Sequence, residues 1–197
     1  VIGDEILSGR TRDTNSGDIA NAMNAIGVDI KEIRVVADEP EGIAEAVNAL
    51  RAKHTYVFTC GGIGPTHDDK TADSIAAAFG VGIDHDERAV AMMRERFPNP
   101  ADLNEGRMRM TRIPFGAELI PNPISKAPGF HIGNVFVMAG VPSIMRAMLS
   151  EVLPQLRTGV PFSSETLTAN LKEGDIATPL AELQKQHQAG SIGSYPF

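Results

Sequence analysis

Short apolar runs alternate with amphipathic segments along most of the chain. Apolar residues that recur every three or four positions are typical of a helix with one buried face, and short β-branched or aromatic runs are typical of strands. The predicted helices are 15–26, 40–51, 69–79, 86–97, 101–110 and 142–152. The predicted strands are 1–3, 28–36, 56–58, 117–120, 129–132 and 135–138. This alternation predicts an α/β fold with a mostly parallel sheet and helices on both of its faces.

Glycine and proline mark several boundaries between these elements. Gly27 and Gly80 follow the last apolar positions of two helices, where a glycine commonly ends the helix. Pro142 begins the helix 142–152, a position at which its missing N–H group costs little. Gly133 and Asn134 separate two strands, and this pair favours a tight β-hairpin turn.

The pattern weakens near residues 154–163, which contain two prolines and a glycine and are interpreted as a linker. Beyond it the sequence predicts a strand at 165–171, a helix at 176–188 and a strand at 191–195. One β-α-β unit is too small to bury a core alone. We therefore expect a main domain at 1–157 and an incomplete small α+β domain at 158–197. Both ends interrupt strand-like runs, so we also expect a longer natural chain.

Composition excludes several classes of protein. The 197 residues carry a formal net charge of −7, which disfavours a nucleic-acid binder, because neutralising phosphates requires a basic surface. No run of about 18 apolar residues is present, so neither a transmembrane helix nor a membrane partner is expected. The start lacks the features of a signal peptide, and the single cysteine excludes an intramolecular disulfide. We expect a cytoplasmic protein.

The strongest chemical signal is a glycine-rich loop between a buried strand and a helix. Glycines allow backbone N–H groups to approach an anion, and the start of a helix adds partial positive charge. This pattern indicates a phosphate site, although the spacing fits neither a Walker motif nor a dinucleotide fingerprint. The alternative is a tight turn followed by a capped helix. The candidate phosphate-binding residues here are Gly61, Gly62, Gly64, Pro65, Thr66 and Thr71.

Carboxylates accompany this loop. Asp68 and Asp69 follow it, and Asp4 and Glu5 follow the first strand, so neighbouring strands would bring all four to one sheet edge. Carboxylates repel phosphates unless a cation lies between them, and Mg²⁺ often bridges the two. The sequence thus suggests Mg²⁺ or another divalent metal at this edge. Helix caps favoured by the helix dipole are the alternative explanation.

Two further turns follow strands and could contribute to the same site. The first includes Asn122, Lys126 and Gly129, of which Lys126 is a candidate phosphate partner, and the second includes Gly140 and Pro142. Plain turns would have the same composition. Cys60 precedes the glycine loop and His67 follows it, so a Cys–His nucleophile is a formal alternative to a packed cysteine. The histidines show no spacing typical of zinc ligands.

Taken together, the segments GDEILSG, DTN, VVADE, GGIGPTHDDKTAD, NP…APG and GVPSIM resemble the MoaB/MogA-like molybdopterin-binding domain family. Over residues 1–157 the sequence is most similar to the N-terminal domain of the competence/damage-inducible CinA proteins, and a related domain is fused to eukaryotic FAD synthases. The resemblance implies a three-layer α/β/α fold and a homo-oligomer.

The resemblance also implies a site. In the molybdopterin branch the pocket takes a pterin, with ATP and Mg²⁺ in adenylylating members. In the CinA branch it hydrolyses dinucleotide pyrophosphates such as ADP-ribose with a divalent metal. The implied catalytic residues are Asp38 and Asp69, and the implied metal ligands are Asp4, Glu5, Asp68 and Asp69. The implied ligand-binding set comprises the six loop residues above and Asn122, Lys126, Gly129, Gly140 and Pro142.

Three positions depart from the CinA pattern. Ser125 replaces a usual glycine, Ala139 a usual proline, and Ile144 a usual glutamate. Three hypotheses follow: a metal-dependent nucleotide pyrophosphatase of the ADP-ribose or FAD type, a molybdopterin binder or adenylyltransferase in molybdenum-cofactor biosynthesis, and a catalytically silent module that binds a ligand. The expected partner is a small nucleotide or pterin in each case.

Overall fold

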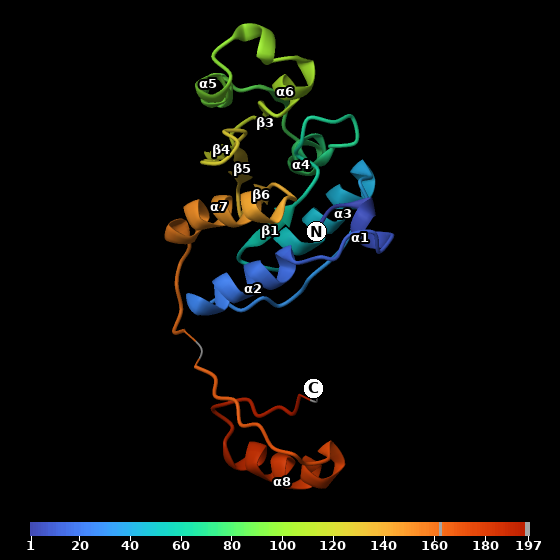
Figure 1. Ribbon diagram of the computed structural model, residues 1–197, viewed down its shortest axis with the longest axis vertical. Helices are drawn as coiled ribbons and strands as arrows, with labels where there is room; N and C mark the ends of the chain where they lie inside the picture. The colour runs from blue at the N-terminus through green and yellow to red at the C-terminus, as the bar shows by residue number, and fades with distance from the viewer. Residues whose placement is uncertain (162, 196–197) are drawn as a thin grey trace. The chain divides into compact units, whose positions relative to one another are not determined.

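A computed structural model describes residues 1–161 and 163–195. It divides the chain into two compact units with a boundary between residues 162 and 163 (Figure 1). Each unit is described separately below.

A four-stranded mixed sheet forms the centre of the first unit. Its order is β1 (Val57–Cys60), β6 (Val135–Met138), β5 (Gly129–Ile132) and β4 (Glu118–Ile120). β1 pairs with β6 in parallel, but the β6–β5 and β5–β4 pairs are antiparallel. The expectation of a mostly parallel sheet is therefore wrong for these strands. The predicted hairpin at Gly133–Asn134 is confirmed, and a two-residue connection requires antiparallel neighbours.

The sheet continues beyond β1 only as a short parallel ladder. Ile2 donates its N–H to the carbonyl of Cys60 (3.0 Å) and forms an isolated parallel bridge with Val36. The predicted strand at 28–36 is wrong apart from this bridge residue. Arg34 accepts one hydrogen bond from the amino group of Val1 (2.8 Å), and residues 28–33 line a cavity instead of a paired strand. The predicted strand at 1–3 is likewise reduced to Ile2.

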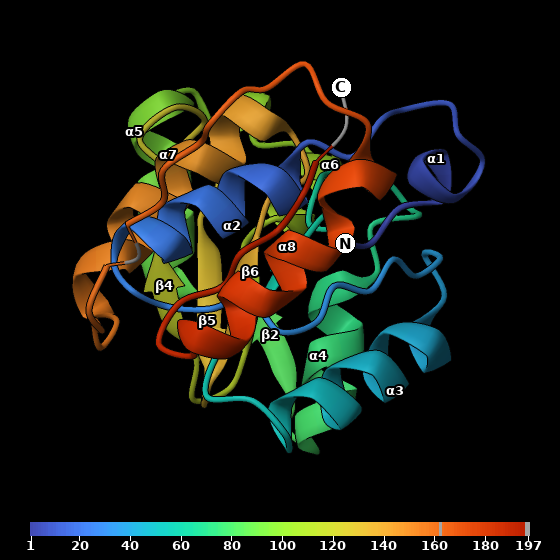
Figure 2. The same ribbon diagram turned by 90° about the horizontal axis from the view of Figure 1, so that it is seen from below.

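Helices cover both faces of the sheet, as expected. α2 (Asn15–Ala25) and α7 (Pro142–Val152) lie on one face, and α3 (Pro40–Arg51) and α4 (Thr71–Phe79) lie on the other (Figure 2). Two hydrophobic clusters reflect these layers. One joins Ile43 and Ile75 to the strands, and the other joins Met23 and Met145 to the opposite strand face. The layers confirm the three-layer α/β/α architecture.

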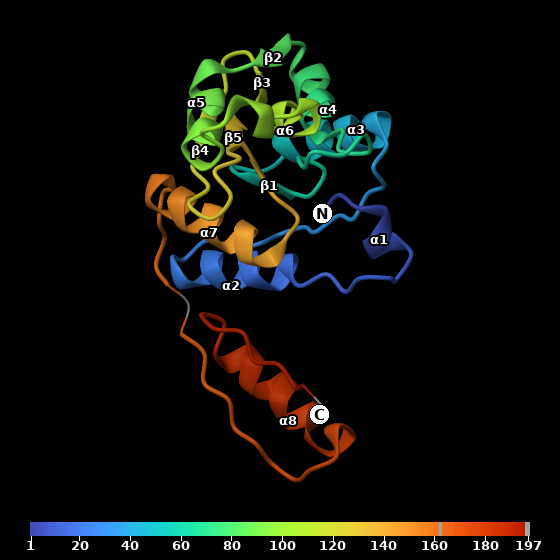
Figure 3. The same cartoon turned by 45° about the horizontal axis from the view of Figure 1, so that its top comes forward.

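A small lobe interrupts the chain between β1 and β6, and the strand pattern did not predict its sheet. β2 (Ile83–His85) pairs antiparallel with β3 (Arg112–Pro114), and α5 (Glu87–Arg96) and α6 (Glu105–Arg109) lie near them (Figure 3). These strands are three residues long and partly exposed, so they lack a buried apolar run. The predicted helix at 101–110 is split into a 3₁₀ turn, Pro100–Asp102, and α6, whose first turn is capped by Asn104.

The remaining short elements of the first unit are α1 (Asp4–Leu7), a single turn after Ile2, and a 3₁₀ turn at Leu153–Gln155 after α7.

The second unit contains α8 (Glu173–Gln186), and its described residues form neither of the predicted strands at 165–171 and 191–195. A strand requires a paired neighbour, and none of the residues of α8 is buried to provide a packing surface. The Gln184 side chain instead holds the following turn through the carbonyl of Gly190 and the N–H of Ile192. No helix among the described residues is long and apolar enough to cross a membrane.

Candidate functional site

A cavity of about 590 Å³ lies where β1 and β6 end. The glycine loop 61–65 forms one side of it, and the turns after β4 and β6 form others. Lining residues that the sequence predicted are Glu5, Asp38, Gly61, Gly62, Gly64, Pro65, Asp68, Asp69, Asn122, Gly140 and Pro142. The structure therefore brings most of the predicted site residues to one place.

The shape of the glycine loop depends on close backbone contacts. Gly61 has a φ of +109°, and a Cβ atom there would lie 2.1 Å from the carbonyl oxygen of Ile2. At Gly62 (φ +66°) a Cβ would lie 2.2 Å from Oγ1 of Thr71. The Thr71 hydroxyl donates to the carbonyl of Gly61 (2.9 Å) and is fully buried. Thr71 consequently shapes the loop and does not line the cavity.

Asp69 organises the second half of the loop. One of its carboxylate oxygens accepts hydrogen bonds from the N–H (2.9 Å) and the hydroxyl (2.5 Å) of Thr66. Arg109 of α6 donates to the backbone carbonyl of Asp69 (3.1 Å) and so connects the loop to the lobe. Thr66 faces Asp69 and lies outside the cavity lining.

Asp38 lines the opposite side of the cavity, and Asp4, a predicted metal ligand that is not among the lining residues, is hydrogen-bonded to it. The Asp4 N–H donates to the Asp38 carboxylate (3.0 Å), and the Asp38 N–H donates to the Asp4 carboxylate (3.4 Å). Burial raises the pKa of Asp38 above its ordinary value, and the negative charges of Asp4, Glu5 and Asp68 add to that rise. The hydrogen bond from Asp4 opposes it. Negative charge is therefore concentrated here, which favours a cation.

The carboxylates do not form a protein-only metal site. Among residues 1–161 and 163–195, no group of three or more histidine, cysteine, aspartate or glutamate side chains is arranged to hold a metal ion. Magnesium is commonly held by one or two carboxylates, with water and substrate phosphates completing its octahedral shell. Glu5, Asp38 and Asp68 at the cavity fit that shared mode of binding.

The turn after β4 is held in shape by Asn122. Asn122 is buried, donates to Ser125 Oγ (2.5 Å) and to the Ala127 carbonyl (2.9 Å), and so fixes the turn that lines the cavity. Gly129 lies in β5, where a Cβ would meet the Val137 carbonyl oxygen at 2.3 Å.

Lys126, the predicted phosphate partner, does not line the cavity. Its ammonium pairs with Glu95 (2.7 Å). Arg96 follows Glu95 in α5, and among the described residues that line the cavity it is the one with a basic side chain. Sequence reasoning missed Arg96 because no local motif surrounds it. It also missed the apolar wall formed by Met93, Phe97 and Met110, which the intervening lobe brings to the glycine loop.

The alternative of a Cys–His nucleophile is not supported. Cys60 is buried, and burial raises the pKa of its thiol, whereas a reactive thiol needs a lowered pKa. The His67 side chain is almost fully exposed and lies near Asp68.

The fold is that of one domain class. Residues 1–158 match the model of the "probable molybdopterin binding domain" family, and residues 161–197 match the "FAD synthase, middle domain". The chain belongs to the molybdopterin-binding-domain family, and within it the chain is related to CinA.

Relatives with full or nearly full coverage of the chain support that assignment. A CinA-like protein of Geobacter sp. is 37% identical over 92% of this chain and 45% of its own length. A probable FAD synthase of Caenorhabditis briggsae is 31% identical over 100% of this chain and 42% of its own length. A protein of Caldivirga maquilingensis is 35% identical over 94% of this chain and 75% of its own length. The chain thus spans less than half of the two relatives with descriptive names.

Solved structures agree on the architecture. The crystal structure of "the protein CinA with unknown function" from Thermoplasma acidophilum superposes with a TM-score of 0.73 and 34% identity, over 78% of this chain and 93% of that one. The molybdopterin biosynthesis enzyme MoaB from Thermus thermophilus superposes with a TM-score of 0.51 and 19% identity, over 79% of this chain and 87% of that one. At that identity, the second likeness concerns the fold alone.

Proposed function

We propose that the cavity binds a nucleotide pyrophosphate of the ADP-ribose or FAD type together with a divalent cation, and hydrolyses it. The observation that carries the proposal is the shared lining: one cavity joins the glycine loop 61–65 to Glu5, Asp38 and Asp68. A phosphate-binding loop beside carboxylates is a combination that a cation makes favourable. The relationship to FAD synthases supports a nucleotide ligand.

The lining suggests a division of roles. Backbone groups of the glycine loop and the guanidinium of Arg96 would hold the phosphates, and Met93 and Phe97 would pack against a flat ring. Glu5 and Asp68 would hold the cation, which, when bound, would offset charge that develops on the phosphate oxygens.

Asp38 is suited to accept a proton, because its pKa is raised. In the proposed step a water oxygen bonds to one phosphorus, the bond from that phosphorus to the bridging oxygen breaks, and two monophosphates leave. The proton lost by the water passes to Asp38 and then to solvent.

The test is an assay of ADP-ribose and FAD hydrolysis with Mg²⁺, in which released AMP is separated by chromatography. We expect Asp38→Asn to lower the rate by about 10²-fold or more, which is the range for loss of a general base. Asp84→Asn removes an exposed carboxylate from β2 and serves as the matched control. AMP release by the unaltered protein no greater than that of Asp38→Asn would refute the proposal.

A second candidate is a pterin ligand, as in molybdopterin binding or adenylylation. The matched family description and the apolar wall near Phe97 favour it. A thermal-shift screen of nucleotides and pterins, with and without Mg²⁺, separates the candidates, because a ligand that binds only the folded state raises the melting temperature. A shift with a pterin but none with nucleotides would select this second function. A nucleotide shift without turnover would select a silent binding module.

A further inference from the structure

The turn after β4 contains a hydroxyl group whose hydrogen-bonding state follows from its neighbours. The side-chain oxygen of Asn122 accepts the backbone N–H groups of Ile124 and Ser125, both at 3.1 Å. The side-chain nitrogen lies 2.9 Å from the carbonyl of Ala127, which can only accept. These contacts fix the orientation of the buried amide, so its other N–H is the group that faces the Ser125 hydroxyl oxygen at 2.5 Å.

The Ser125 hydroxyl therefore acts as an acceptor within the turn. Besides the Asn122 amide, the N–H of Ala127 donates to it over a longer distance of 3.4 Å. A hydroxyl has two acceptor positions and one donor, so both acceptor positions are used and the O–H remains. No group in the described part of the chain accepts a hydrogen bond from this O–H. Ser125 lines the cavity at the ends of β1 and β6, so the donor is available to a ligand there.

A positive charge lies beside this donor. Arg96 of α5 donates to the carbonyl of Ile124 (3.0 Å), the residue before Ser125, and lines the same cavity. This bond uses one of the five N–H groups of a guanidinium. Among the residues that the structure describes, no carboxylate pairs with Arg96, whereas its neighbour Glu95 pairs with Lys126 (2.7 Å). The charge of Arg96 is therefore left for an anion in the cavity.

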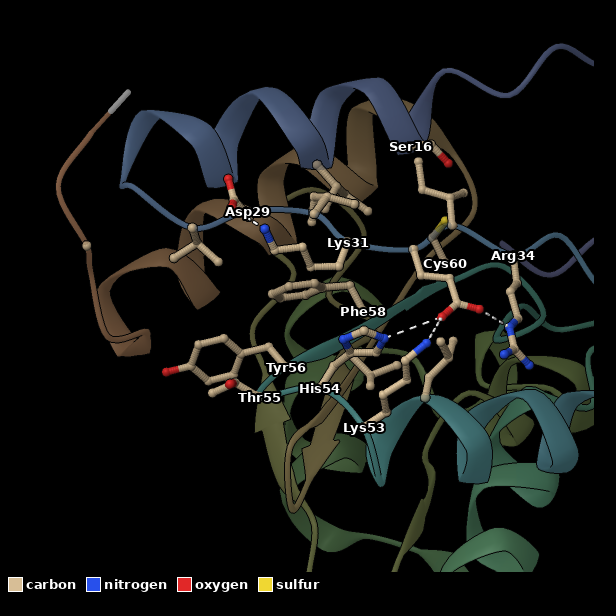
Figure 4. Close-up of a pocket in the computed structure, with 18 of the residues that line it drawn as sticks. Ser16, Asp29, Lys31, Arg34, Lys53, His54, Thr55, Tyr56, Phe58 and Cys60 are labelled. Atoms are coloured by element: carbon tan, nitrogen blue, oxygen red, sulfur yellow. Dashed lines mark hydrogen bonds and ion pairs between the residues drawn. The ribbon is translucent and has the colours of Figure 1, made fainter. Parts of the chain in front are cut away.

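Another cavity of the first unit, of about 520 Å³, gives a contrast. It lies between segment 28–34 and residues 54–58 (Figure 4). Lys31 pairs there with Asp29, and Arg34 pairs with Glu32 (2.7 Å). Carboxylates of the chain thus compensate these cations, as they do not for Arg96.

Donors for anionic oxygens are present on two sides of the first cavity. On one side, the N–H groups of residues 62–64 in the glycine loop have no acceptor among the described residues. On another side are the Ser125 hydroxyl and Arg96. A hydrogen bond is stronger when its acceptor is ionised, so a donor beside an uncompensated cation favours a phosphate oxygen over a neutral hydroxyl. A ligand with two linked phosphates can use both sets of donors.

We infer that Ser125 and Arg96 form a second phosphate subsite, which makes the cavity selective for two linked phosphates over one. The inference rests on the proposed function, in which the glycine loop holds the first phosphate. Ser125 is a specificity-determining residue in this arrangement. It binds the ligand and takes no part in proton transfer or bond cleavage.

The experiment measures the binding of AMP and of α,β-methylene-ADP by calorimetry in the presence of Mg²⁺. The two ligands differ by one phosphate, and water cannot cleave the carbon bridge of the analogue, so the result does not depend on turnover. We expect the unaltered chain to bind the analogue at least about tenfold more tightly than AMP. Ser125→Ala should lower the affinity for the analogue by about tenfold, because a hydrogen bond to a charged acceptor is lost, and should change that for AMP by less than about twofold.

Two further variants serve as controls. Ser125→Thr keeps a hydroxyl and should bind the analogue within about threefold of the unaltered chain. Ser150→Ala removes an exposed hydroxyl of α7, which donates to the carbonyl of Arg146, and should change neither affinity.

The inference is overturned if the unaltered chain does not bind the analogue, or binds it no more tightly than AMP. Equal losses for both ligands in Ser125→Ala would also overturn it, because they would show that the hydroxyl only shapes the turn. A preference for the analogue that depends on Ser125 supports the subsite even if ADP-ribose yields no AMP, in which case only the proposed hydrolysis fails. Hydrolysis with an unchanged affinity of Ser125→Ala would refute the subsite alone.

Discussion

The side-chain amide of Asn15 donates a 2.7 Å hydrogen bond to the carbonyl of Gly140. This bond links the first turn of α2 to the turn after β6, and Gly140 in turn approaches Gly61 so closely that a Cβ would lie 3.1 Å from the Gly61 Cα. One buried asparagine therefore ties α2 to the turn after β6, and that turn lies against the glycine loop of the proposed phosphate site.

Replacing Asn15 by alanine should destabilise the protein by about 1–2 kcal/mol, the usual cost of losing a buried hydrogen bond. Urea unfolding measures this change. Asn24→Ala, at an exposed position of the same helix, is the matched control and should change stability by less than about 0.5 kcal/mol. Equal losses for the two variants would contradict the role given to Asn15.

Gly61→Ala should destabilise the protein by at least about 2 kcal/mol, because φ is positive and the new Cβ would overlap the Ile2 carbonyl oxygen. Gly17→Ala should have the opposite effect. Gly17 lies within α2 with open space around it, and alanine is favoured over glycine in a helix by roughly 0.5–1 kcal/mol. Thermal unfolding measures the change in stability of both variants. A Gly61→Ala protein as stable as the unaltered chain would refute the described loop conformation.

Acid should weaken the ion pairs that Glu32, in segment 28–34, forms with its basic neighbours, and so lower the stability of the protein. Hydrogen bonds from Arg34, Lys53 and His54 lower the pKa of Glu32 from 4.5 to about 2. A carboxyl group whose folded-state pKa is lowered contributes stability above the ordinary pKa and loses it as the pH falls toward the folded value. The contribution of Glu32 should thus be complete above pH 4.5 and decline between pH 4.5 and about 2.

Glu32→Gln tests this dependence by urea unfolding at several pH values. The variant should be less stable than the unaltered chain at pH 7, and the difference should shrink below pH 4.5. A difference that is independent of pH would show that the charge of Glu32 is not its cause.

Asn122→Ala should cost about 2–4 kcal/mol, because four hydrogen bonds of a buried side chain are lost and each contributes about 1 kcal/mol. Asn48→Ala removes an exposed asparagine with one bond to Arg51 and is the control. Unfolding by denaturant compares them. An Asn122→Ala protein as stable as Asn48→Ala would remove the basis for a rigid turn at the cavity.

The two neighbouring basic residues should differ in ligand binding. The test uses a nucleotide that shifts the melting temperature. Arg96→Ala should lower the affinity for this nucleotide by about tenfold or more, because a cation–phosphate hydrogen bond is lost. Lys126→Asn removes a charge outside the cavity and keeps a residue that tolerates the positive φ of 64° at this position, so affinity should stay within about twofold. Calorimetry measures both, and the reverse order would return the phosphate role to Lys126.

The sequence allowed prediction of those features that local patterns determine. The helices of the two outer layers, the hairpin at Gly133 and the convergence of the glycine loop with Asp38 all follow from periodicity, turn chemistry or motif likeness. The strand at 28–36 has a suitable composition, but a strand also requires a paired neighbour, and composition does not supply one. The same reason explains the absence of the two strands predicted within residues 163–195.

The cavity wall formed by Arg96 and Phe97 depends on tertiary structure alone. The lobe between β1 and β6 folds back onto the glycine loop through contacts such as that of Arg109 with the Asp69 carbonyl. Neither residue lies in a motif, and both are far from the glycine loop along the chain, so the sequence does not indicate that they lie beside it. The metal requirement and the reaction are predictions that the experiments above test.

The parallel pairing of β1 with β6 has a consequence for the order of folding. Val57 meets Val135 directly, so residues 61–134, which contain the lobe together with α4, β4 and β5, form the loop that this pairing must close. Closing a long loop costs chain entropy before its contacts form, and such pairings slow folding. During synthesis the glycine loop leaves the ribosome well before β6 and Gly140. The glycine loop, which is one half of the proposed phosphate site, is therefore synthesised before the turn that forms the other half, and it stays exposed until then.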